Sequence, residues 1–81
     1  MHILVSFRGA VSDHTGEKST SIEMAESTDI SSLLQLLIAK YPKVKTISKY
    51  LCISVNGSLA TRDRELSEGD VVELFFRMGG G

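Results

Sequence analysis

The sequence predicts a single α+β domain in which one main helix packs across a mixed β-sheet of four to five strands. Its 81 residues leave room for one hydrophobic core, and 42% hydrophobic against 23% charged residues is the composition of a folded chain. One stretch has the periodicity of an amphipathic helix. Before it and after it lie stretches in which apolar and polar residues alternate, as they do in β-strands. A helix that covers one face of a sheet satisfies this order.

Two strands are expected before the helix. Residues 2–8 are rich in β-branched and aromatic side chains, and three apolar residues would share one face: Ile3, Val5 and Phe7. Residues 9–18 contain two glycines and show little periodicity, which predicts a loop between antiparallel strands. Alternation returns at residues 19–24, where Ile22 and Met24 would face the same core.

The helix is the most strongly indicated element. The side-chain oxygens of Ser27, Thr28 and Asp29 can accept hydrogen bonds from the free N–H groups of a first helical turn. Apolar residues follow at helical spacing, at Ile30, Leu33, Leu34, Leu37, Ile38 and Tyr41. Pro42 ends the helix because it lacks an N–H group. Residues 42–49 are predicted as a polar connection in which Val44 and Ile47 cover one end of the core.

The C-terminal half is predicted to contain three more strands. Residues 51–55 and 58–60 flank Asn56-Gly57, a pair that favours a two-residue hairpin turn with positive φ angles. Residues 66–70 form a second turn, because Gly69 and Asp70 are typical turn residues. The last strand spans residues 71–76 and would bury Val72, Leu74 and Phe76.

Composition argues against several kinds of site. Cys52 is the only cysteine, which excludes an internal disulfide, and His2 and His14 lack further ligands at suitable spacing, so we expect no metal site. We find no paired carboxylates, activated nucleophile or cofactor loop, so we expect neither catalytic residues nor a bound cofactor. No export signal and no membrane-spanning run is visible, which predicts a cytoplasmic protein without membrane association.

The charges are balanced overall but unevenly distributed. A net charge of -1 argues against broad binding to nucleic acid. Four lysines nevertheless lie in a stretch without acidic residues: Lys40, Lys43, Lys45 and Lys49. Acidic residues dominate a later stretch, at Asp63, Glu65, Glu68, Asp70 and Glu73. The two stretches are either solvated surfaces or patches of which one steers a protein partner.

The three final residues, Gly79, Gly80 and Gly81, directly follow the last predicted strand and its exit through Arg77 and Met78. Glycine has no β-carbon, so such a tail can pass through a narrow channel. It also leaves a terminal carboxylate unhindered for attack on the α-phosphate of ATP. We therefore divide the chain into a domain of residues 1–78 and a flexible tail of residues 79–81, of which Gly79 and Gly80 would thread and Gly81 would be activated.

The whole chain resembles the β-grasp, ubiquitin-like sulfur carriers of the MoaD/ThiS family, and within them most strongly the small subunit of molybdopterin synthase. The resemblance rests on Val5-Ser6-Phe7, the helix of residues 30–41, Ile53-Ser54-Val55-Asn56, the turn and strand that begin at Leu66-Ser67-Glu68-Gly69-Asp70, and the terminal Gly80-Gly81. The spacing from the Leu-x-x-Gly-Asp turn to the terminal glycines is the most specific of these features.

The resemblance implies a carrier and not an enzyme. A ubiquitin-activating-type enzyme would use ATP to adenylate Gly81, and sulfur transfer would then give a C-terminal thiocarboxylate. In the molybdopterin case the tail would insert into the large subunit of the synthase, which performs the chemistry. In the family's strand order the first strand pairs with the last, and the last with the third. This order would gather Leu4, Cys52, Val71 and Phe75 on the sheet face away from the helix. We expect partner docking there, through Phe75, Val71, Leu4 and Arg77.

Alternatives remain open at this point. Molybdopterin synthase subunits often carry a Pro-Pro pair where this chain has Phe76-Arg77. The same fold and tail serve thiazole synthesis, tRNA thiolation and ubiquitin-like conjugation to lysine. A ubiquitin-like module that binds partners without covalent chemistry is the remaining class. The length of residues 9–18 and the full helix favour the molybdopterin branch over the shorter thiazole carriers.

Overall fold

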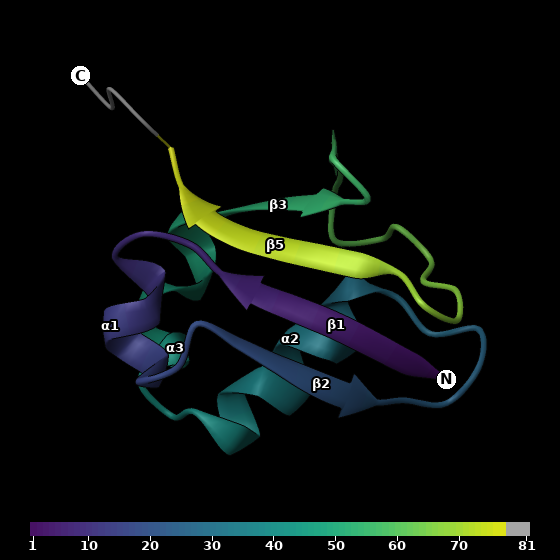
Figure 1. The fold of residues 1–81 in the computed structure, drawn as a ribbon, viewed down its shortest axis with the longest axis horizontal. Helices are drawn as coiled ribbons and strands as arrows, with labels where there is room; N and C mark the ends of the chain where they lie inside the picture. The colour runs from purple at the N-terminus through teal and green to yellow at the C-terminus, as the bar shows by residue number, and fades with distance from the viewer. Residues whose placement is uncertain (78–81) are drawn as a thin grey trace.

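The computed structural model describes residues 1–77 and contains one mixed, five-stranded sheet in the order β2-β1-β5-β3-β4 (Figure 1). The strands are β1 His2–Phe7, β2 Ser19–Glu23, β3 Leu51–Val55, β4 Ser58–Leu59 and β5 Val71–Phe76. The central strands β1 and β5 are parallel, and the other neighbours are antiparallel. The helices are α1 Val11–Thr15, α2 Ile30–Lys40, α3 Val44–Ile47 and the 3-10 helix η1 Ser48–Tyr50. The predicted strand order is confirmed.

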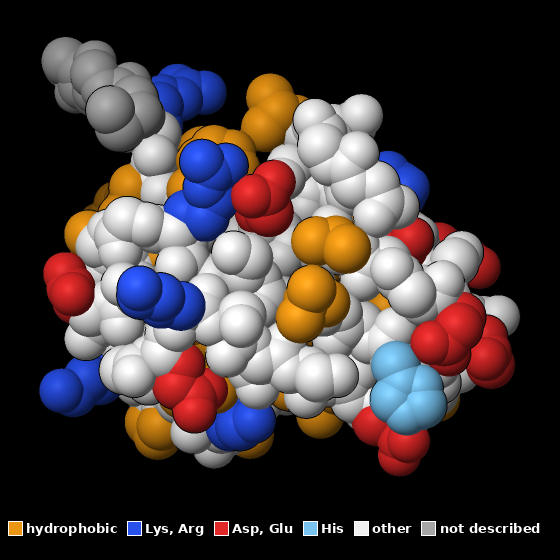
Figure 2. Space-filling view, viewed as in Figure 1, with side chains coloured by type: hydrophobic (Ala, Val, Ile, Leu, Met, Phe, Trp, Pro, Cys, Tyr) orange, Lys and Arg blue, Asp and Glu red, His pale blue; other side chains and the backbone are white. Residues whose placement is uncertain are grey.

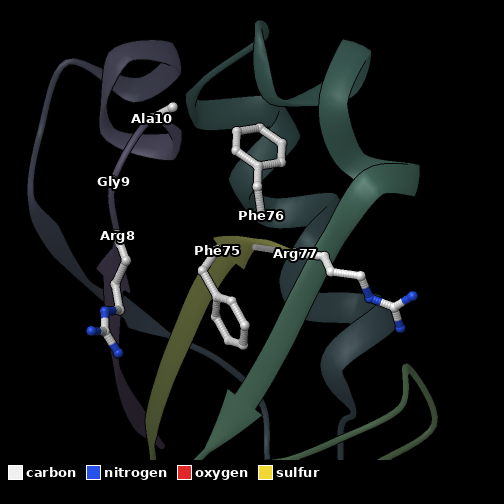
Figure 3. A pocket seen from close by; sticks show the side chains of 6 residues that line it. All are labelled: Arg8, Gly9, Ala10, Phe75, Phe76 and Arg77. Atoms are coloured by element: carbon white, nitrogen blue, oxygen red, sulfur yellow. The ribbon is translucent and has the colours of Figure 1, made fainter. Parts of the chain in front are cut away.

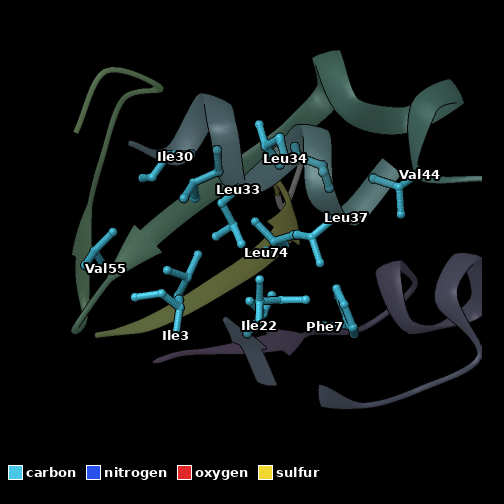
Figure 4. Packing of buried hydrophobic residues seen from close by; sticks show 14 of the residues in the cluster. Ile3, Phe7, Ile22, Ile30, Leu33, Leu34, Leu37, Val44, Val55 and Leu74 are labelled. Carbon is cyan, nitrogen blue, oxygen red and sulfur yellow. The ribbon is translucent and has the colours of Figure 1, made fainter. Parts of the chain in front are cut away.

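Helix α2 covers one face of this sheet and forms the core with it (Figure 4). It begins as predicted, because Asp29 Oδ1 accepts a hydrogen bond of 3.0 Å from the backbone N–H of Ser32. Leu33 and Leu37 are fully buried on its inner side. The strands meet them with side chains that are equally buried: Ile3, Val5, Val72 and Leu74. This core of α2 and sheet holds β5, which carries the C-terminal end of the domain.

Residues 9–18 are not the irregular loop that their sequence suggests. They contain α1, which ends at Gly16 with φ of 76° and with the Gly16 N–H donating to the carbonyl of Ser12. Val11 is fully buried in the core. The prediction is wrong here because a helix of five residues is too short to show a period, and burial of one side chain decides whether it forms.

Residues 42–49 also contain helical structure that the prediction of a polar connection missed. Helix α3 begins at Val44, two residues after Pro42, and the turn of η1 follows α3 directly. Val44 and Ile47 are buried, so their predicted role of covering the end of the core is confirmed. Lys43, Lys45 and Lys49 are exposed on the outside of this segment.

The turn before β5 is tied to the β3–β4 hairpin by side chains. Asn56 and Gly57 have φ angles of 52° and 87°, as the hairpin turn requires. The buried carboxylate of Asp70 accepts hydrogen bonds from Asn56 Nδ2 at 2.9 Å and from the Ser67 N–H at 2.8 Å. Asn56 Oδ1 accepts another from the Val71 N–H at 2.9 Å. The start of β5 is therefore held by these bonds as well as by the sheet.

Strand β5 is paired with β3 to its end and with β1 as far as Leu74. Phe76 is the partner of Leu51 on β3, and the Arg8 N–H donates to the carbonyl of Leu74 at 3.0 Å. The chain leaves the sheet at Arg77 from this anchored position. Within residues 1–77, no helix has the length and apolar character that crossing a membrane requires.

Candidate functional site

The candidate site consists of the end of β5 and the sheet face that α2 does not cover. The predicted reactive residue Gly81 and the predicted threading residues Gly79 and Gly80 lie outside the described residues. The structure shows the part of the domain that precedes these glycines in the sequence. It comprises the sheet face with Leu4, Val71 and Phe75, and the exit of the chain from the sheet at Arg77.

Leu4, Cys52, Val71 and Phe75 lie on the same sheet face, but as two separate pairs. Leu4 is paired with Val71 across β1 and β5, and these side chains are 45% and 38% exposed. Cys52 is paired with Phe75 across β3 and β5, and both are partly buried. The expected single cluster is therefore wrong, and Figure 2 shows hydrophobic side chains on this face only in small separated patches.

The side chain of Glu73 and its hydrogen-bond partners separate the two apolar pairs. Glu73 lies between Val71 and Phe75 on β5, with its Oε2 3.1 Å from Arg8 Nη1 and its Oε1 3.2 Å from Ser54 Oγ. At about 3.3 Å per residue, Val71 and Phe75 are about 13 Å apart along the strand. A partner that covers this face must contact two apolar patches with a bound carboxylate between them.

A pocket of about 510 Å³ lies at the exit of the chain from the sheet. We call it the exit pocket, and it is lined by Arg8, Gly9, Ala10, Phe75, Phe76 and Arg77 (Figure 3). Phe75 and Phe76 point to opposite sides of β5, and Arg8 and Arg77 lie on either side of Phe75. The ring of His14 on α1 packs against Phe76 at 6.1 Å between centroids, in an edge-on arrangement. Of these residues, the sequence predicts Phe75 and Arg77 as docking residues of the sheet face, and it predicts no pocket.

Sequence reasoning missed Arg8, Gly9 and Ala10 as part of this site. They reach it because β1 is parallel to β5, with Phe7 opposite Leu74. Extending the parallel pairing of the first and last strands by one residue beyond Phe7 and Leu74 would have placed Arg8 beside Phe75. Residues 9–18 were interpreted as a loop, and so their beginning was not connected to the exit.

The described part of the chain offers no arrangement for catalysis. Among residues 1–77, no group of three or more His, Cys, Asp or Glu side chains is placed to hold a metal ion. Cys52 is a partly buried free thiol on a paired strand.

Comparison with known proteins decides the family. The sequence profile of the ThiS family matches residues 5–81. The chain belongs to the ThiS family. Members of this family are small ubiquitin-like carriers or modifiers that work with enzymes and are not catalysts themselves, so this chain is a carrier-type protein and not an enzyme. A search of curated proteins found no match.

Solved structures confirm the β-grasp fold. SAMP1 from Haloferax volcanii superimposes with a TM-score of 0.90 at 15% identity, and each chain is covered completely. A putative molybdopterin converting factor subunit 1 from Pyrococcus furiosus has a TM-score of 0.87 at 24% identity, covering 95% of this chain and 98% of the other. In a complex of molybdopterin-converting factor subunits 1 and 2 from Helicobacter pylori, the similar chain has a TM-score of 0.72 at 23% identity, with both fully covered.

Proposed function

We propose that this member of the ThiS family carries sulfur as a thiocarboxylate on Gly81, in the cytoplasm. An adenylating enzyme of the ubiquitin-activating type joins the Gly81 carboxylate to the α-phosphate of ATP, and pyrophosphate leaves. A sulfur nucleophile then displaces AMP, and the resulting thiocarboxylate delivers sulfur to an acceptor. The carrier itself holds no cofactor. The observation that carries this proposal is the family match that runs through the terminal glycines, directly after a strand anchored on both sides.

The anchoring of β5 is what the proposed chemistry requires. Four residues follow Arg77 in the sequence, and at about 3.5 Å per extended residue they reach about 14 Å at most. An enzyme that acts on Gly81 must therefore come close to the exit of β5. A well-anchored strand fixes the starting point of that reach, so docking of the domain also positions the reacting carboxylate.

The acceptor that we propose is the pyranopterin precursor of the molybdenum cofactor, with this chain as the small subunit of molybdopterin synthase. The likeness to the Pyrococcus furiosus and Helicobacter pylori proteins supports this choice, since both are described as subunits of molybdopterin-converting factor. The large subunit of the synthase would then be the second partner and would receive the tail. The likeness to SAMP1, a small archaeal modifier protein, favours one alternative, conjugation of Gly81 to lysine side chains.

Intact-mass spectrometry tests the proposal. The protein is incubated with an extract of its host's cells, ATP and a sulfur donor, beside a control that carries one extra alanine after Gly81. We expect a mass increase equal to the replacement of one oxygen by sulfur, located at Gly81 by fragmentation. The control should not change, because its terminal carboxylate is displaced by one residue.

Two other outcomes would change the conclusion. A series of heavier isopeptide adducts, absent from the control, would assign the chain to protein modification. If neither form changes while a known carrier is modified in the same extract, the terminal chemistry is wrong. Binding without covalent activation would then be the function of this domain.

A further inference from the structure

The exit pocket lies where a partner must approach if Gly81 is activated, and the following inference rests on that proposed function. An enzyme acting within about 14 Å of Arg77 contacts the end of β5 and the segment from Arg8 to Ala10. Because this segment and β5 form the walls of the exit pocket, the pocket is part of the contact. The chemistry of its walls then indicates what the partner presents.

The exit pocket has an apolar lining between two guanidinium groups. Phe75, Phe76 and Ala10 supply its apolar surface, and its volume of about 510 Å³ is ample for a large side chain. Arg8 donates to Glu73 through Nη1, while its other nitrogens have no hydrogen bond to residues 1–77. Arg77 is exposed and has no ion pair within the described part of the chain.

The end of the molecule that holds the exit pocket carries several basic side chains. Helices α3 and η1 lie at the same end of the molecule as the exit of β5 (Figure 1). They and the residue before α3 present Lys43, Lys45 and Lys49, which are exposed and without ion pairs to described residues. Red side chains are most numerous at the opposite end, around the N-terminus, and fewer of them lie at the end with α1 (Figure 2). There Glu23 and Glu68 face His2, at 3.2 and 3.5 Å from its ring nitrogens.

We propose that the exit pocket receives an apolar side chain from an acidic loop of the activating enzyme. The apolar lining binds the tip of that loop, and Arg8 and Arg77 bind carboxylates on either side of it. Guanidinium groups suit this role because they donate two parallel hydrogen bonds to a carboxylate. The lysines of α3 and η1 attract the same acidic surface from a distance and raise the rate of association.

The geometry favours an extended acidic loop over a small anion. In Figure 3 the side chains of Arg8 and Arg77 diverge on the two sides of Phe75. They are therefore not placed to surround a single phosphate or sulfate. A loop with an apolar residue between two acidic ones matches both the separation of the charges and the apolar surface between them.

Two substitutions test the two parts of this inference. Ala10→Trp fills the exit pocket from an exposed position, and Arg77→Glu reverses a charge at its rim. Arg64→Glu is the matched control. Arg64 is exposed, and its side chain makes no hydrogen bond to described residues. Its backbone carbonyl accepts a hydrogen bond from Ile30, the first residue of α2, so it does not belong to the exit pocket. Thermal unfolding followed by circular dichroism verifies that all three variants are folded.

The assay is ATP–pyrophosphate exchange catalysed by the purified ubiquitin-activating-type enzyme of the same organism, with each carrier variant as substrate. We expect kcat/KM to fall about tenfold for Ala10→Trp at low and high salt, and about tenfold for Arg77→Glu at about 0.05 M salt. The Arg77→Glu deficit should shrink to about twofold at about 1 M salt, where the screening length is about 3 Å. Arg64→Glu should stay within about twofold.

The outcomes separate this inference from the proposed function. If the enzyme activates the wild type and both exit-pocket variants stay within about twofold of it, the inference is overturned while carrier function stands. A deficit for Arg77→Glu alone overturns the insertion of an apolar side chain. If no adenylation of the wild type occurs, the proposed function fails and this inference fails with it.

Discussion

Substitution of Asp70 should destabilise the domain more than any other change in its turns. The carboxylate is 9% exposed and accepts two hydrogen bonds, from Asn56 Nδ2 at 2.9 Å and from the Ser67 N–H at 2.8 Å. In Asp70→Ala both donors lose their acceptor, and each lies in a turn next to the start of β5. The hairpin turn and the turn before β5 are then no longer joined through this side chain.

The expected loss follows from the number and kind of these bonds. A hydrogen bond to a charged group contributes about 1.5–3 kcal/mol, and water reaches the edge of this site, so we take the lower value for each. Asp70→Ala should therefore lower the free energy of unfolding by about 3 kcal/mol. For a domain of this size that corresponds to a fall in Tm of about 12–24 °C. Asp70→Asn keeps the shape but offers one acceptor oxygen instead of two, so it should lose about half as much.

Urea unfolding followed by circular dichroism measures both variants against Glu26→Ala, an exposed acidic residue without a hydrogen bond to described residues. The control should change stability by less than about 0.5 kcal/mol. The argument is refuted if Asp70→Ala is as stable as the control. It is also refuted if Asp70→Asn is as destabilised as Asp70→Ala, because the loss would then depend on charge and not on the number of acceptors.

Two further predictions concern the core and the docking face. Leu37→Ala should lower the free energy of unfolding by about 2–5 kcal/mol, because Leu37 is fully buried between α2 and the sheet. Leu36→Ala is the control: Leu36 is exposed on the same helix, so this change should shift the unfolding midpoint in urea very little. Phe75→Ala should lower kcat/KM for adenylation about tenfold and destabilise the fold less than Leu37→Ala, since Phe75 is only partly buried where it lines the exit pocket. Leu59→Ala, at an exposed residue of β4, is its control, and an equal loss in both variants would argue against a specific role of Phe75.

Much of the fold and part of the site could be predicted because the signals are local. Helix α2 has an N-cap, an apolar period and a terminating proline within adjacent residues, and the hairpin has its Asn56-Gly57 turn between two alternating stretches. The turn before the last strand and the glycines after it indicated the family, and the match of the ThiS profile to residues 5–81 confirms that family.

The sequence by itself thus determined the fold class, most of the core and the family. Only the tertiary structure decided how the sheet face that α2 leaves uncovered is composed. Glu73 divides the apolar face because Arg8, directly after β1, and Ser54, on β3, hold its carboxylate there. The exit pocket exists because the parallel pairing of β1 with β5 brings Arg8 beside Phe75. Such contacts depend on strand register between residues that are far apart in the chain, and no local pattern encodes that register.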